Sequence, residues 1–315
     1  MLVLQKIKGK KAQSIKGSVT RDNFDFFIMI LPALVLLFLF NYAPLYGLLI
    51  GFKKYNPNLG IFKSPWVGLD NFKFFFTSSD AFRVTRNTLL YNGSFIIIDL
   101  IVAVALALLF FNLRNRIALK TYNTIVILPK FLSAVLIAFI VYGILNPVSG
   151  VVNQVVQSLG MEAVDWYSKP GAWPFILTIV HIWSSIGMNC ILYYASLMGI
   201  DDSLFEAATL DGASKWKMIT NICIPHLSTI MCITSILAVG GIFGGDFGLF
   251  YQVPRNIGAL YPTTDILPTY IFRGLQDGNM SISTAIGFFQ SLVGMCLVIA
   301  TNAIVTKIAP ENSLF

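Results

Sequence analysis

TLLYNGSFIIIDLIVAVALALLFFNL, residues 88–113, holds one charged side chain, Asp99, along its whole length. A bilayer core about 30 Å thick needs about 20 helical residues to cross it. This stretch exceeds that length and is bounded by charge on both sides. It therefore predicts a helix that spans a membrane.

The composition of the whole chain agrees with this stretch. Of its 315 residues 56% are hydrophobic and only 12% are charged, and the mean hydropathy is +0.73. A soluble core of this size could not hide so much apolar material. The bilayer is therefore the expected solvent.

Five further apolar stretches have the length of a span. With the first, the six predicted spans are 26–52, 88–113, 122–145, 172–200, 225–243 and 282–308. Pro32, Pro44 and Pro129 lie inside them, as neighbouring helices in lipid allow. No small-x-small cleavage site follows the first run, which favours a retained span over a signal peptide. We expect an all-α polytopic membrane protein whose six transmembrane helices form one domain, residues 26–308.

Basic residues suggest the orientation. Those before the first span, in residues 1–25, and those between the second and third spans place the N-terminus in the cytoplasm, although the opposite segments carry nearly as many. An even number of spans then makes the tail, residues 309–315, cytoplasmic. The net charge of +7 does not indicate nucleic acid, because the charges are scattered over loops apart from one cluster that suits anionic membrane lipid.

Two predicted outer connections, residues 53–86 and 146–171, are long enough to be structured. Each is either a packed lid over the helices or a short helix at the membrane surface. Neither is strongly basic on one face, which favours the lid.

The segment 201–225 combines features of a docking site. It contains Glu206-Ala207-Ala208-Thr209-Leu210-Asp211-Gly212-Ala213. Alanines allow close approach of another surface, an acidic residue suits a helix N-terminus, and Gly212 permits a sharp exit. Taken alone, the segment could equally be an ordinary surface helix and turn.

The spacing of this segment resembles a family pattern. Glu-Ala-Ala, three residues, Gly, nine residues and Ile-x-x-Pro are typical of binding-protein-dependent ABC importer permeases, and Ile222 and Pro225 complete the match. The resemblance implies a type I ABC importer permease fold with this segment as a cytoplasmic coupling helix that fits a groove of an ATPase. The implied coupling residues are Glu206, Ala207, Ala208, Asp211, Gly212 and Ala213.

Other motifs extend the resemblance along the chain. Residues 67–72 and 86–88 are similar to the first external segment of sugar permeases of the maltose-permease type, and residues 243–251 to the branch that takes up complex oligosaccharides. The implied setting is a bacterial cytoplasmic membrane, with saccharide as the cargo. The implied partners are a second homologous permease, two ATPase subunits and an extracellular solute-binding protein.

No catalysis is expected in this chain. It lacks a Gly-x-x-x-x-Gly-Lys-Ser/Thr phosphate-binding loop, so ATP and its Mg²⁺ would be bound by the ATPase partner and no cofactor is expected here. Four cysteines without a Cys-x-x-Cys pair, and His181 and His226 without a matching ligand cluster, predict no metal site.

Sugar contacts are expected from aromatic faces and polar groups at similar depth in the membrane. The candidates are Tyr142, Asn146, Trp183, Asn189, Tyr193, Asp246, Tyr251, Gln252, Phe288 and Gln290. Each could instead pack helices together or belong to an aromatic belt at the membrane surface.

Two ionisable residues lie inside predicted spans, where a charge must be paired or reach water. Asp99 and Lys130 could form a proton relay. The favoured interpretation is that Asp99 pairs within the bundle and Lys130 extends to the cytoplasmic surface.

Three other functions are kept as alternatives: a polytopic membrane enzyme, an ATP-independent secondary transporter, and a permease for a solute other than sugar. The sequence has no nucleophile motif for the first and no inverted repeats with broken spans for the second. Co-purification of an ATPase and a second permease would separate an importer subunit from the first two.

Overall fold

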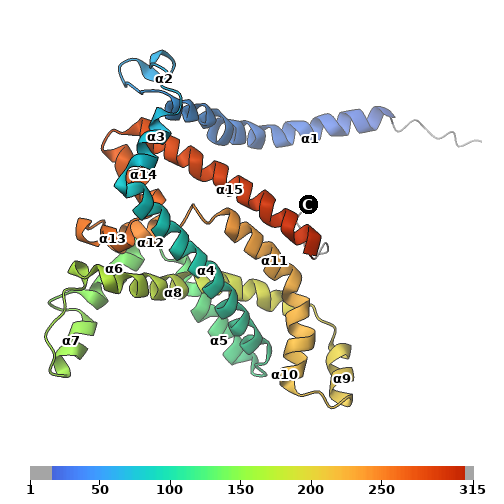
Figure 1. Cartoon of the computed structure of the whole chain (residues 1–315). Coiled ribbons are helices and arrows are strands. Elements are labelled where there is room, and N and C mark those ends of the chain that lie inside the picture. Colours follow the sequence, from blue (N-terminus) through green and yellow to red (C-terminus); the bar gives the residue numbers. More distant parts are fainter. Residues whose placement is uncertain (1–15, 309–315) are drawn as a thin grey trace, which may run out of the picture.

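The structure, a computed structural model, describes residues 16–308, and these are almost wholly helical (Figure 1). The described residues contain no β-strand, only an isolated antiparallel β-bridge between Lys53 and Trp66. The predicted all-α class is confirmed. The tail 309–315 and most of the basic segment 1–25 lie outside the described residues.

Five helical stretches of the described chain are long and apolar enough to cross a membrane. They confirm the first, second, fourth, fifth and sixth predicted spans. The elements that form them are α1 (Lys16–Leu37) with η1 (Phe38–Tyr42) and η2 (Ala43–Phe52), α4 (Ser79–Phe111), α8 (Trp173–Leu197), α10 (Lys215–Met218) with η6 (Ile219–Cys223) and α11 (Ile224–Gly240), and α15 (Met280–Ile308).

The third predicted span is broken. Helix α5 (Arg116–Ile127) and η3 (Leu128–Phe131) meet α6 (Ala134–Leu145) at 103°, so the structure has six spans only if this bent pair counts as one. Pro129 has no N–H to continue a helix, and Leu132 and Ser133 are extended. The Ser133 hydroxyl then accepts from the Leu136 N–H at 3.2 Å and starts α6 in its new direction.

The spans pack most closely where glycine and alanine line them. Ala103 and Ala107 of α4 are fully buried beside Cys190 of α8, and α8 also packs along α5. At Gly187 of α8 the α5 backbone approaches so closely that a Cβ would lie 2.8 Å from Ile127 Cα. These contacts fix α8 as the central helix of the bundle (Figure 1).

Short helices fill the connections at one end of the bundle. They are α2 (Gly60–Lys63), α3 (Asp70–Thr77), α7 (Val151–Ser158), η4 (Trp166–Ser168), η5 (Pro170–Ala172), α12 (Phe247–Gln252), η7 (Gly258–Leu260), α13 (Tyr261–Thr264) and α14 (Leu267–Gln276). Both long connections fold onto the spans, as the lid interpretation requires. Asn71 donates to the carbonyl of Gly51, and the Trp166 carbonyl accepts from Trp173 Nε1 at 2.9 Å.

A buried carboxylate holds this end together. Asp265, whose side chain is fully buried, accepts from Arg273 at 2.6 Å and from Arg83 of α4 at 3.1 Å. Asn87 of α4 donates to the Asp265 carbonyl at 3.0 Å. The chain between α13 and α14 is therefore tied to the start of the longest helix.

Candidate functional site

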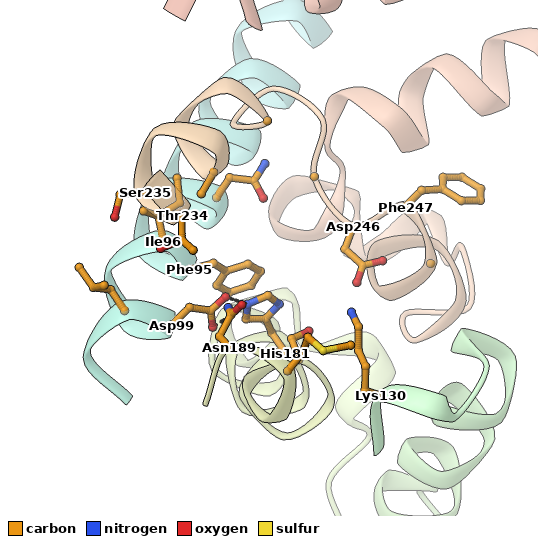
Figure 2. A pocket seen from close by; sticks show the side chains of 18 of the residues that line it. Phe95, Ile96, Asp99, Lys130, His181, Asn189, Thr234, Ser235, Asp246 and Phe247 are labelled. Carbon is orange, nitrogen blue, oxygen red and sulfur yellow. Dashed lines mark hydrogen bonds and ion pairs between the residues drawn. The ribbon is translucent and has the colours of Figure 1, made fainter. Parts of the chain in front are cut away.

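A cavity of about 760 Å³ lies in the middle of the bundle (Figure 2). Residues from α4, η3, α8, α11 and the start of α12 surround it. Its charged and polar lining consists of Asn92, Asp99, Lys130, His181, Ser185, Asn189, Tyr193, Thr234, Ser235 and Asp246. Such a lining is suited to a hydrophilic solute.

One wall of the cavity is a carboxylate–imidazole pair. His181 Nε2 lies 3.1 Å from each carboxylate oxygen of Asp99, and the imidazole stacks on Phe95 with ring centroids 3.8 Å apart. The prediction that Asp99 pairs within the bundle is confirmed, and His181 is a packed residue. This pairing joins α4 to α8.

Lys130 and Asp246 face each other across another part of the cavity, as Figure 2 shows. Asp246 also begins α12, because its Oδ1 accepts from the Leu249 N–H at 2.9 Å. Lys130 lies at the break of the third span, where the chain turns after Pro129. The break directs Lys130 toward the cavity, and its extension to the cytoplasmic surface stays a prediction.

Three predicted sugar contacts meet in this cavity: Asn189, Tyr193 and Asp246. The Tyr193 hydroxyl is 2.8 Å from Thr234 Oγ1 of α11. The sequence prediction missed the hydroxyls of Thr234 and Ser235, which lie across the cavity from Asp246 (Figure 2). A serine or threonine inside an apolar span was the only available signal for them.

Three other predicted contacts meet in a second pocket of about 410 Å³ between α6 and the chain after α12. Tyr142, Tyr251 and Gln252 line it together with Arg255 and Asn256, which the sequence prediction missed. The Arg255 guanidinium lies 4.3 Å from the centroid of the Tyr142 ring. We call this space the outer pocket.

The remaining four candidates lie apart from both spaces. Asn146 is used in a turn, where its Oδ1 accepts from the Val148 N–H, and Phe288 packs between Phe52 and Phe72. Trp183 is 41% exposed on the flank of α8. Gln290 lines a separate pocket of about 370 Å³ beside Phe247.

The predicted docking segment forms α9 (Asp202–Leu210). Asp201 precedes it, and hydrogen bonds from the Ser203 N–H and hydroxyl hold the pKa of that carboxyl below its usual value. Gly212 has φ +74°, and the Ala213 N–H reaches back to the Ala208 carbonyl at 2.9 Å. This left-handed turn ends α9 sharply.

The surface of α9 is open. Glu206, Ala207, Asp211 and Gly212 are all exposed, and Ala208 and Ala213 are half-buried. Leu210 is 89% exposed, and Leu204 of the same helix and Trp216 of α10 are also exposed apolar side chains. In Figure 1, α9 projects from the end of the molecule away from α2 and α3.

Comparisons with known proteins cover nearly the whole chain. A family model described as "Binding-protein-dependent transport system inner membrane component" matches residues 99–311. Protein LplB of Bacillus subtilis (strain 168) is 31% identical over 303 residues, 96% of this chain and 94% of that protein. The polygalacturonan/rhamnogalacturonan transport system permease protein YteP of the same strain is 30% identical, covering 91% of this chain and 89% of its own length.

A solved structure has the same fold. It belongs to a bacterial ABC transporter involved in the import of the acidic polysaccharide alginate, and its matching chain is 30% identical with a TM-score of 0.85. The match covers 94% of this chain and 99% of that one.

Proposed function

Because this chain belongs to the family of binding-protein-dependent transport system inner membrane components, we propose that it is the saccharide-translocating subunit of an ATP-driven importer. The family match includes both the segment around Glu206 and most of the cavity lining. We propose an oligosaccharide as the cargo, because YteP belongs to a polygalacturonan/rhamnogalacturonan transport system and the solved transporter is involved in the import of alginate. The polar lining and the aromatic Phe95, Tyr193 and Phe247 of the cavity suit such a solute.

The single observation that carries the coupling role is the open surface of α9. This short helix ends in a sharp turn and exposes Leu204 and Leu210, and Trp216 is exposed at the start of α10. Exposed apolar side chains of this kind are typical of a surface that binds a partner. We assign it to a groove of a separate ATPase, which binds ATP and Mg²⁺. The chain itself has no phosphate-binding loop for that purpose.

A movement of α9 would be transmitted directly to the helices that line the cavity. Helix α9 follows α8 after a short link and precedes α10 and α11, and α8 and α11 both line the cavity. Phe205 of α9 also contacts Phe111 at the end of α4, with ring centroids 5.6 Å apart. An ATPase that binds α9 differently in two states therefore biases the cavity between two shapes.

The first span suggests a second permease. None of the apolar window in Phe26–Phe52 is buried inside this chain, and Figure 1 shows α1 extending away from the bundle. Lipid alone could cover that surface, but the family commonly pairs two homologous permeases. We propose that α1 packs on such a partner.

The proposed orientation places α9 and both chain ends in the cytoplasm of a bacterium. The short helices around α3, α7 and α13 then face outward, where a solute-binding protein delivers the sugar. Their folded, hydrogen-bonded structure provides a stable surface for such a partner.

The test uses the whole assembly and a charge reversal. Glu206→Lys should leave the protein in the membrane but abolish co-purification of the ATPase and ATP-dependent sugar uptake. Glu162→Lys makes the same change at an exposed residue near the proposed outer end and should retain both. Sugar uptake by Glu206→Lys without a bound ATPase would contradict the proposal and favour a secondary transporter.

A further inference from the structure

Helix α12 lies between the central cavity and the outer pocket and carries an aromatic surface. Phe247 and Tyr251, one helical turn apart, stack with centroids 5.0 Å apart and planes at 19°. Phe272 of α14 packs against both, at 4.9 and 5.0 Å. Phe247 is one of the residues around the cavity and Tyr251 lines the outer pocket, so α12 runs between the two spaces.

Arg255 lies at the outer end of this surface in a backbone conformation that favours glycine. Its φ is +59° and that of Asn256 is +50°, and the Asn256 N–H closes the turn on the Tyr251 carbonyl at 3.1 Å. A glycine would make the same turn without strain. What arginine adds at this position is its side chain.

The Arg255 guanidinium is held but not neutralised. Its face lies 4.3 Å from the centre of the Tyr142 ring, and Tyr142 packs edge-on against the buried Tyr167. Among the described side chains, no carboxylate lies within 4.0 Å of Arg255. By contrast, Arg83 and Arg273 of the same end both contact Asp265.

The rest of the outer pocket is neutral. Besides Arg255 it is lined by Tyr142, Tyr251, Gln252, Asn256, Val135, Ala138 and Phe139. Three aromatic rings, two amides and one guanidinium are the groups that bind the C–H face, hydroxyls and carboxylate of an acidic sugar. The central cavity differs, because Asp99 and Asp246 accompany its Lys130 and His181.

We propose that the outer pocket binds a carboxylate-bearing unit, a uronic acid, of the oligosaccharide before it enters the central cavity. The guanidinium edge of Arg255 donates to the carboxylate, while Tyr142 and Tyr251 contact the ring and Gln252 and Asn256 contact hydroxyls. This inference rests on the proposed function, since it names the class of saccharide. A phospholipid phosphate would also suit Arg255, but it would not use the amides or the aromatic surface of α12.

The experiment compares an acid with its neutral ester. The complete importer in liposomes is supplied with saturating loaded binding protein, and uptake of trigalacturonate and of its methyl ester is measured. Arg255→Gln should lower the acid-to-ester ratio of uptake rates about tenfold, the loss of one charge-assisted contact. Arg255→Lys should lower it less. Arg86→Gln, at another exposed arginine of the same end, should leave the ratio unchanged.

Direct binding provides a second readout. Saturation-transfer NMR of the assembly without its binding protein should detect trigalacturonate and lose most of that signal in Arg255→Gln. Native mass spectrometry of the same variant reports any phospholipid that it no longer retains.

The outcomes are distinct. An unchanged acid-to-ester ratio, or loss of a bound phospholipid without a change in the ratio, would overturn the uronate site. The uronate site would also be overturned if the wild-type importer took up and bound only neutral oligosaccharides. That result would leave the proposed function intact. Transport of no oligosaccharide at all would overturn the proposed function itself.

Discussion

His181 and Asp99 form the one carboxylate–imidazole pair within the described spans, with Nε2 at 3.1 Å from both oxygens. They belong to α8 and α4, so the pair joins the central helix to the longest one. Phe95 covers the imidazole on one face at 3.8 Å. The position of His181 in the cavity wall therefore depends on a partner on another helix.

Removing the carboxylate should loosen this junction. In Asp99→Leu the buried His181 loses its acceptor, which costs about 1–3 kcal/mol. In Asp99→Asn the amide oxygen can still accept from a neutral imidazole, and most of that stability should remain. Thermal unfolding of the purified assembly, followed by fluorescence, compares the two. Equal midpoints for Asp99→Leu and wild type would show that the pair contributes nothing to stability.

The sequence was sufficient to predict the features of the fold that depend on local residue patterns. Apolar length predicted six spans, of which five are confirmed, and Gly212 predicted the turn after α9, where its φ is +74°. What composition did not predict depends on tertiary contacts. Proline can lie inside a span, as Pro32 does in α1. At Pro129 the span breaks instead, because Ser133 starts a new helix shortly afterwards.

The candidate site was predicted only in part for the same reason. Asp99 and His181 are far apart in sequence, and nothing local indicates that they meet. Arg255 looks like an ordinary loop residue, since neither its positive φ nor its contact with Tyr142 is visible in the sequence. Tyr142 and Tyr251 were predicted because aromatic faces near span ends suit the C–H surfaces of a sugar.

Gly212 offers a test of the coupling turn with an internal control. Gly160 has φ +79° and ends α7 with the same bond pattern, from the Met161 N–H to the Val156 carbonyl at 3.2 Å. Neither glycine has a neighbour near its would-be Cβ. Valine strains either backbone by about 1–2 kcal/mol.

Only Gly212→Val changes the direction of the segment assigned to the ATPase. Sugar-stimulated ATP hydrolysis should therefore fall severalfold in Gly212→Val and stay near wild type in Gly160→Val. Equal losses in both variants would mean that strain, and not docking, explains the effect.

Asp265 offers a test of the outer connection. Its carboxylate is fully buried between Arg83 and Arg273. Asp265→Asn should destabilise the assembly by about 3 kcal/mol, because the partly buried Arg273 loses its counter-charge and Arg83 loses one of two. Asp80 pairs with the same Arg83 at 2.7 Å but is 39% exposed. Asp80→Asn should cost under about 1 kcal/mol. The thermal midpoints of the two variants provide the comparison, and a larger loss for Asp80→Asn would contradict it.

Gly187 tests whether the central helix tolerates any added volume. A Cβ there would lie 2.8 Å from Ile127 Cα and closer still to the Val126 carbonyl oxygen, and backbone atoms cannot rotate away. Gly187→Ala should therefore push α5 away from α8 and lower the free energy of unfolding by about 1–3 kcal/mol.

Gly93→Ala makes the same change in α4, where no atom lies within 4 Å of the added Cβ. It should raise stability by about 0.5–1 kcal/mol, because alanine favours the helix. Opposite shifts of the thermal midpoint would assign the effect to the α5–α8 contact, whereas shifts of the same sign would exclude that contact as its cause.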